Sequence, residues 1–264
     1  MLAVAATRVA LAQEYDVEEL DRKIAALAAN SDLARYDWRQ RGRAPIGYIK
    51  GMAVAYGRVY QEWKDGTLPT TLMAMANTHL PGKDALSWIA GTFDDRDMPI
   101  DKPGADTLRA LFVLLTGLGM RESSGRFCEG RDRSARNTSS DTAEAGLFQM
   151  SWDAHIASRD IVNLFDKYSS EDSDLVHIFH EGVRCSEEDL QNYGSGNGRA
   201  FQEACKANPM CAIMTTAVGL RVIRSHWGPV NRREVEIRPE ADALFKQVET
   251  MVDGESMVAE VSPF

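Results

Sequence analysis

The stretch that decides the fold runs from residue 105 to residue 125 and reads ADTLRALFVLLTGLGMRESSG. Its apolar residues recur at three- and four-residue steps, and further apolar residues fill the remaining sides of the same segment. This pattern predicts a helix from Ala105 to Arg121 that is buried nearly all round. Gly125 then offers a left-handed stop, the conformation in which many helices end.

Helical periodicity also dominates the rest of the chain, whereas alternating runs of β-branched residues are nearly absent. The sequence therefore predicts a mainly α fold. Polar stretches predict a surface connection at 93–104 and a loop at 125–142, and no internal repeat is found. The further helices that we expect cover Val17–Ala29, Pro45–Lys64, Ile161–Tyr168, Asp174–Phe179, Pro209–Ser225 and Glu240–Val252.

Composition limits the class of protein. The 264 residues are 44% hydrophobic and 26% charged, as in ordinary globular proteins. The formal net charge of -9 argues against nucleic acid as a partner, because phosphate binding needs a basic surface. No run approaches the roughly 20 apolar residues of a membrane-spanning helix, so no transmembrane segment is expected.

The cysteines indicate an oxidising compartment. Three of the four, Cys185, Cys205 and Cys211, fall close together in a polar, glycine-rich part of the chain. We expect a disulfide between Cys185 and either Cys205 or Cys211. Residues 1–13 contain an apolar stretch interrupted by Arg8, which leaves a signal peptide open. The predicted location is the periplasm or the cell exterior.

Glu122 is the leading candidate for chemistry. It falls at the end of the apolar helix, where desolvation and the partial negative charge of the helix C-terminus both raise the pKa of a carboxyl group. A carboxyl that keeps its proton near neutral pH can act as a general acid, for example on a glycosidic oxygen. The alternative is a solvated glutamate at a helix end.

Two motifs resemble a known family. Glu122-Ser123 ends the apolar helix, and Gly146-Leu147-Phe148-Gln149 follows the polar loop. This arrangement is similar to that of the goose-type lysozymes and soluble lytic transglycosylases, in which a Glu-Ser pair is followed by Gly-Leu-Met-Gln. Residues 192–198, which include Tyr193, are a loose counterpart of the family's Tyr-Asn-Ala-Gly stretch. The resemblance covers roughly residues 105–200 and is absent from the N-terminal third.

The resemblance implies a lysozyme-like fold with little β structure and an extra helical N-terminal region. The domains expected are a helical extension at 1–100 packed on a catalytic domain at 101–253, with a C-terminal tail at 254–264. Glu122 would be the general acid, and Ser123 would support the substrate or the loop. Gly146 to Gln149 would line the floor of the cleft, with Tyr193 close to Glu122.

A second carboxylate is less clear. Glycosidases commonly use two, and the loop offers several. Asp141 lies at about the position of an aspartate that positions water in goose-type lysozymes, and Glu144 is the second choice. Lytic transglycosylases instead use one glutamate with help from the substrate's N-acetyl group, so the sequence leaves hydrolase and transglycosylase chemistry open.

Other polar clusters of the sequence are candidates for contact with a sugar or a metal. His226 and Trp227 follow an apolar helix and are suited to contact sugar rings, but a helix-ending turn with a buried tryptophan is the favoured interpretation. His177 and His180 have helical spacing but no suitable acidic or cysteine partner, so neither a metal nor a cofactor is expected. The arginines that could form a basic cleft are Arg121, Arg126, Arg131 and Arg133.

The function expected is cleavage of the β-1,4 bond between N-acetylmuramic acid and N-acetylglucosamine in peptidoglycan or a related N-acetylated glycan. The alternatives are a chitinase or chitosanase, and a non-catalytic glycan-binding protein of the cell envelope. The sequence does not define the oligomeric state.

Overall fold

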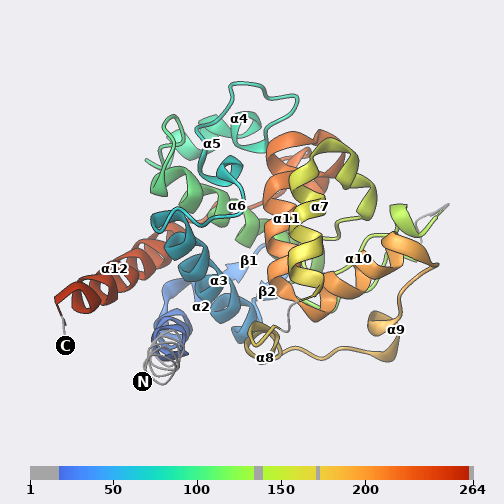
Figure 1. Ribbon diagram of the computed structural model, residues 1–264, viewed down its shortest axis with the longest axis horizontal. Helices are drawn as coiled ribbons and strands as arrows, with labels where there is room; N and C mark the ends of the chain where they lie inside the picture. Colours follow the sequence, from blue (N-terminus) through green and yellow to red (C-terminus); the bar gives the residue numbers. More distant parts are fainter. Residues whose placement is uncertain (1–17, 134–138, 171–172, 262–264) are drawn as a thin grey trace, which may run out of the picture.

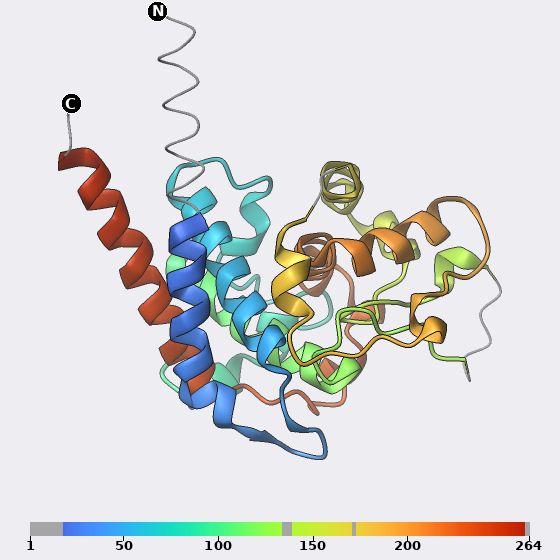
Figure 2. The same ribbon diagram turned by 90° about the horizontal axis from the view of Figure 1, so that it is seen from below.

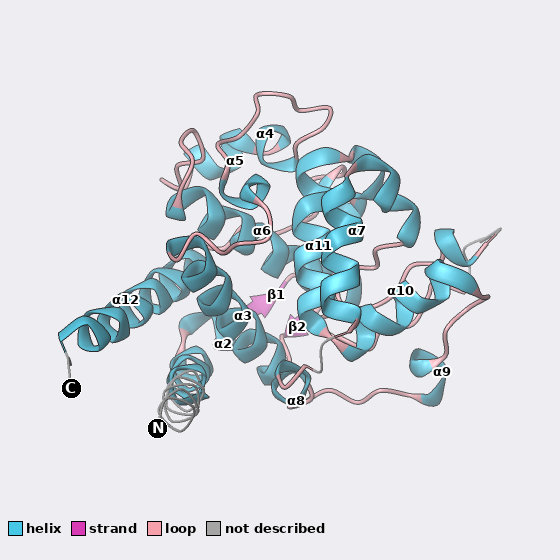
Figure 3. Cartoon of the chain, in the orientation of Figure 1, coloured by secondary structure: helices cyan, strands magenta, loops and turns pink. Residues whose placement is uncertain are grey.

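The computed structural model describes residues 18–133, 139–170 and 173–261. The apolar stretch at residues 1–13 therefore lies outside the described residues. The fold is mainly helical, which confirms the predicted class (Figure 1). The two short strands β1 (Asp37–Trp38) and β2 (Gly42–Arg43) pair antiparallel in a small hairpin (Figure 3).

The N-terminal half consists of a helix over residues 18–30 and the elements that lead to the central helix. These are α2 (Asp32–Arg35), α3 (Ile46–Lys64), η1 (Thr71–Ala74), α4 (Ala85–Trp88), α5 (Ala90–Asp94) and α6 (Ala105–Ser123). The C-terminal half consists of η2 (Ser140–Thr142), η3 (Trp152–Ala157), α7 (Arg159–Ser169), α8 (Leu175–Phe179), α9 (Glu187–Leu190), α10 (Gly196–Ala207), α11 (Pro209–Val222), η4 (Arg224–His226), η5 (Gly228–Val230) and α12 (Pro239–Val261).

Helix α6 is the centre of the molecule. Its residues from Thr107 to Met120 are all buried, as the apolar pattern predicts. It contacts α3, α11 and α12, and α7 runs beside α11 on the far side (Figure 1). Buried side chains from both halves form one hydrophobic core.

Two buried arginines fasten the outer elements to this core. Arg109 interrupts the apolar run of α6, and its guanidinium forms ion pairs with Asp242 (2.8 Å) and Glu249 (2.7 Å) of α12. Arg221 of α11 pairs with Asp84 at 2.9 Å with both side chains fully buried. Arg221 also donates to backbone carbonyls of residues 72–76, so it holds the loop around η1 in place. A buried charge is tolerated only when it is paired and hydrogen-bonded in this way.

Helix α12 is longer than the sequence pattern indicated. It was expected to end at Val252, but it continues to Val261 and leaves the body of the molecule beside the helix over residues 18–30 (Figure 2). Helix α10 and the short α4 and α5 were not expected at all. Within the described residues, none of the helices is both long and apolar enough to cross a membrane.

The disulfide differs from the expected pairing. Cys128 pairs with Cys185 across 57 residues, with their Cα atoms 5.9 Å apart, while Cys205 and Cys211 are free and buried. The expected partners of Cys185 were wrong because both lie in helices, α10 and α11, whose apolar sides form the core. Cys128 lies in the loop just after α6, so the bond fastens that loop to the segment after α8.

We predict that replacing Cys128 and Cys185 together by serine lowers the free energy of unfolding by about 2–5 kcal/mol, because the bond closes a long loop in the unfolded chain. Urea unfolding with and without reductant measures this. The wild type should lose stability on reduction, whereas the double variant should not respond. A wild type that is equally stable in reductant would contradict the prediction.

Candidate active site

Glu122 lies in the last turn of α6, which ends through two left-handed residues. Ser124 has φ 56° and Gly125 has φ 75°, so the left-handed turn that ends α6 begins at Ser124, one residue before the glycine. A side chain on Gly125 would collide with the ring of Tyr48 of α3. Glycine therefore allows this turn to lie close to α3. Glu122 is thereby held at the boundary between the core and the surface, where it is partly buried.

The Glu-Ser and Gly-Leu-Phe-Gln motifs meet in space. The Ser123 hydroxyl donates to the carbonyl oxygens of Leu147 (2.8 Å) and Gly119 (3.0 Å). Ser123 is itself buried, so its hydroxyl supports the loop rather than facing solvent. This hydrogen bond joins the two motifs at the end of α6, although its two residues are 24 positions apart in the sequence.

The second motif forms a tight turn. A bridge between Ala145 and Met150 closes it, and Gly146 and Gln149 have positive φ values of 75° and 49°. The Gln149 side chain donates back to the Gly146 carbonyl at 3.1 Å. A non-glycine residue with positive φ is strained and persists only where the surroundings enforce it. Leu147 and Phe148 are buried, and Phe148 packs against α6.

A distant segment covers Glu122. Gly228, at the start of η5, approaches so closely that a Cβ atom there would collide with Oε1 of Glu122. Gly228 also has φ 47°, so two separate constraints favour glycine at this position. The approach of this backbone removes water from one side of the carboxyl group.

The pKa of Glu122 is raised to about 7. Desolvation is the main cause, and the negative charge of Glu144 adds to it. The positive charges of Arg232, Arg41 and Arg121 act in the opposite direction. Glu122 therefore keeps its proton much closer to neutral pH than an ordinary glutamate does.

The structure brings Glu144, and not Asp141, into electrostatic contact with Glu122. Asp141 instead accepts a hydrogen bond from the backbone N–H of Gly198 (3.1 Å) and so anchors the start of α10. Glu144 precedes the tight turn, and desolvation together with the carboxylates of Asp132 and Asp153 raises its pKa. The sequence favours Asp141 over Glu144, whereas in the structure the charge that acts on Glu122 is that of Glu144, and Asp141 is hydrogen-bonded to the start of α10.

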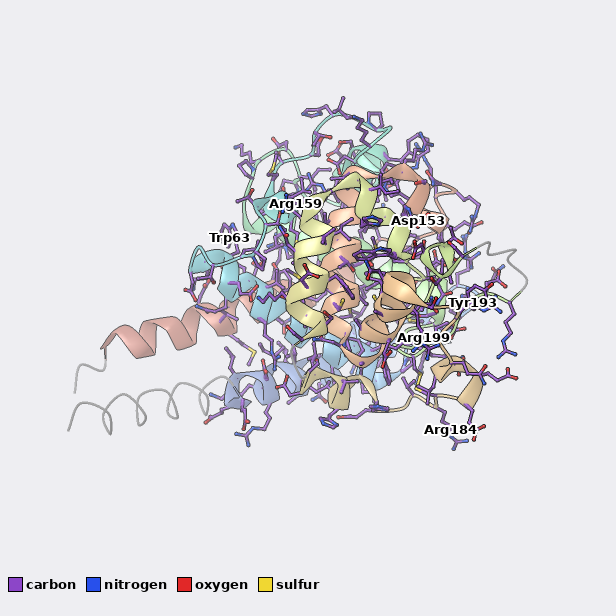
Figure 4. All side chains as sticks on the ribbon, turned by 45° about the vertical axis from the view of Figure 1, so that its right-hand side comes forward. Trp63, Asp153, Arg159, Arg184, Tyr193 and Arg199 are labelled. Carbon is purple, nitrogen blue, oxygen red and sulfur yellow. A yellow bond between two sulfur atoms is a disulfide. The ribbon has the colours of Figure 1, made fainter. Side chains whose placement is uncertain are left out.

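Tyr193 lies away from Glu122. Its ring is covered by the Arg131 guanidinium, 4.4 Å from the ring centre, beside α10 and Arg199 (Figure 4). Tyr193 and Arg131 line a separate hollow of about 250 Å³. Among the residues that the structure describes, no hydrogen bond or ring contact joins Tyr193 to Glu122.

His226 and Trp227 have different environments. Trp227 is fully buried, so its ring cannot stack on a sugar, and the interpretation as a buried turn tryptophan is the correct one. The imidazole of His226 lies 3.5 Å from Asp153, and burial lowers its pKa. Asp153 also accepts a hydrogen bond from the Ser151 hydroxyl, and its negative charge helps to raise the pKa of Glu144.

The arginines near Glu122 are mostly not those expected. Arg126 pairs with Asp189 and Glu129, and Arg133 pairs with Glu188, so both are turned to other carboxylates. Arg121 pairs with Glu234 at 3.4 Å, and Arg232 pairs with the same carboxylate at 3.1 Å. Arg41, from the hairpin, donates to the Arg121 carbonyl and to the Ser124 hydroxyl.

Sequence reasoning missed Gly228, Arg41 and Arg232 as parts of the site. Arg41 and Gly228 lie 81 and 106 residues from Glu122 in the sequence, and neither belongs to a motif that points to Glu122. The only available signal was the dense polar and aromatic cluster that starts at His226. Within the described residues, no group of three or more side chains has the arrangement of a metal site.

Comparison with known proteins gives no relative. No protein-family model, no curated protein and no solved structure matches the chain. The function must therefore be argued from the site itself.

We predict that Gly228→Ala displaces the Glu122 carboxyl, because the new methyl group would collide with Oε1 at the end of that flexible side chain, and that it lowers stability by about 1–3 kcal/mol through the positive φ. Gly66→Ala is the matched control, since Gly66 has φ 68° with open space around it. Urea unfolding measures the stability of both variants, and titration of the Glu122 carboxyl measures its pKa. Similar stability losses are expected for the two, whereas the Glu122 pKa should shift in Gly228→Ala alone; an unshifted pKa in that variant would show that Gly228 does not press on Glu122.

Proposed function

We propose that this chain is a lysozyme-like enzyme that cleaves the β-1,4 bond between N-acetylmuramic acid and N-acetylglucosamine in peptidoglycan, with Glu122 as the general acid. One observation carries the proposal. The Glu122 carboxyl, at the end of a buried helix, has a pKa of about 7, and the next residue, Ser123, is hydrogen-bonded to the strained Gly-Leu-Phe-Gln turn. Perturbed acids in such surroundings are typical of catalytic sites.

The chemistry would begin with a proton transfer. The protonated Glu122 donates its proton to the glycosidic oxygen while the bond from that oxygen to the anomeric carbon breaks. The resulting Glu122 carboxylate can then take a proton from the attacking hydroxyl group. If that group is water, the product has a reducing end. If it is the 6-hydroxyl of the same muramic acid residue, the product is the anhydro sugar of a lytic transglycosylase.

Glu144 would be the second carboxylate of the pair. Its negative charge helps Glu122 to keep its proton, and once ionised it can stabilise positive charge on the sugar ring. Asp153 is near enough to raise the pKa of Glu144, and His226 lies 3.5 Å from Asp153. Both side chains can form hydrogen bonds to the substrate's hydroxyl groups. These assignments replace the roles first expected for Asp141 and Trp227.

The charges around Glu122 favour peptidoglycan over chitin or chitosan. Arg41, Arg121 and Arg232 surround the acid, although the chain as a whole carries a net charge of -9. Peptidoglycan carries carboxylates, either on muramic acid or on the peptide attached to it, and chitin carries none, while chitosan is cationic and would be repelled. The disulfide fits the proposed location in the periplasm or outside the cell. A non-catalytic glycan-binding protein has no need for an acid poised at neutral pH.

Replacing Glu122 by glutamine should reduce the clearing of a peptidoglycan suspension by about 100-fold to 10,000-fold, since the amide cannot donate the required proton. Glu129→Gln is the matched control, because Glu129 lies in the following loop and pairs with Arg126. The control should retain most of the activity. If Glu122→Gln clears peptidoglycan at the wild-type rate, the assignment of the acid is wrong.

The rate should fall as the pH rises through about 7, because only the protonated Glu122 can act as the acid. Glu144→Gln removes a neighbouring negative charge, so it should lower the pKa of Glu122 and move this alkaline limb to lower pH. The residual activity of the variant across pH measures the shift. An alkaline limb that stays in place would exclude coupling between the two carboxyl groups.

A further inference from the structure

A hollow with four arginines lies next to the candidate active site. It measures about 290 Å³ and is bounded by the hairpin, by α5 and by the segment that leads from η5 to α12. Its charged lining residues are Arg39, Arg96, Arg233, Arg238, Glu234 and Glu236.

The positive charges of this hollow are only partly neutralised. Arg238 pairs with Glu240, but Arg96 donates to the backbone carbonyls of Ile237 and Thr92. Within the part of the chain that the structure describes, the guanidinium groups of Arg39, Arg96 and Arg233 have no carboxylate partner. Three unpaired guanidinium groups thus face one small space on an acidic protein.

The two glutamates of the hollow are already engaged. Glu234 binds Arg121 and Arg232, which flank Glu122. Glu236 accepts hydrogen bonds from the Tyr36 hydroxyl (2.8 Å) and from the backbone N–H of Arg39 (2.9 Å). Their negative charges therefore stabilise neighbouring groups and leave the three unpaired arginines available.

Arg233 is held in a costly conformation. Its φ is 54°, and its guanidinium lies 5.1 Å from the ring centre of Trp88, whose indole N–H donates to the Val230 carbonyl. Strain of this kind is often found where a side chain is positioned for a ligand. Trp88 gives the guanidinium a stacked position beside the hollow.

The hollow is linked to the site of Glu122 through shared segments of the chain and one ion pair. The segment that covers Glu122 at Gly228 continues directly into the wall formed by residues 230–238. Glu234 lines the hollow and binds Arg121, the residue before Glu122. On the other side, Arg39 lines the hollow and Arg41 reaches the end of α6.

We propose that this hollow binds the carboxylates of the short acidic peptide that is attached to muramic acid, with Arg39 and Arg233 as its principal contacts. The inference rests on the proposed function, since it extends the same substrate from the glycan to its peptide. Guanidinium groups bind carboxylates through paired, charge-assisted hydrogen bonds, and the hollow is large enough for a few residues of extended peptide.

The test is calorimetric titration of the Glu122→Gln protein with the tripeptide L-alanyl-γ-D-glutamyl-diaminopimelate. We expect binding that weakens about tenfold in Arg39→Gln and in Arg233→Gln, a change equivalent to roughly 1.4 kcal/mol. A tripeptide with amidated carboxyl groups should bind weakly or not at all. Arg159→Gln is the matched control, because Arg159 is an exposed arginine at the start of α7 (Figure 4) and is not among the residues that line the hollow.

Cleavage assays separate this inference from the proposed function. Wild-type protein, Arg39→Gln and Arg233→Gln should cut glycan strands freed of peptide at the same rate, while the two variants should be slower on intact peptidoglycan. If the tripeptide fails to bind, or if inorganic phosphate binds instead, the inference is wrong even when Glu122 is catalytic. If the tripeptide binds but no glycan is cut, the proposed function fails and the peptide site remains.

Discussion

The burial of α6 is the constraint on which the rest of the structure depends. This helix has apolar residues on every side, so other helices must surround it, and its C-terminal end leaves the core in the turn that follows Ser123. Arg109 shows how strict the constraint is, because the one charged residue within the buried run is matched by carboxylates of α12. The environment of the Glu122 carboxyl is a consequence of where the helix ends.

The long helices could be predicted because their periodicity is imposed by burial. Helices α3 and α6 differ by only one or two residues from the expected bounds. Helix α10 was missed because it begins with Gly196-Asn-Gly198, a composition typical of loops. In the fold, Gly198 must be glycine because Ser140 and Asp141 lie against it, so tertiary packing overrides local propensity there. The disulfide was mispredicted for a related reason, since sequence proximity does not reveal which cysteines face the core.

The two motifs of the site could be predicted, but their surroundings could not. Glu122 and the Gly-Leu-Phe-Gln turn carry recognisable residues, and the Ser123 hydroxyl supports the loop, which is one of the two roles that the resemblance implied for it. Gly228, Arg41 and Arg232 reach Glu122 from other parts of the chain, and their contributions are steric and electrostatic. Nothing in a local pattern specifies that a backbone will approach a carboxyl group from 106 residues away. Such contacts decide the pKa of the acid, so the chemistry depends on the tertiary structure more than on the motif.

The central claim is that the fold keeps a proton on Glu122 near neutral pH. The most direct measurement is an NMR titration of the side-chain carboxyl carbons of carbon-13-labelled glutamate, with Glu122→Gln used to assign the signal. We expect the Glu122 carboxyl to titrate at about pH 7, well above the ordinary value of 4.5. Titration near 4.5 would contradict the account, because the carboxyl group would then be solvated and fully ionised at neutral pH.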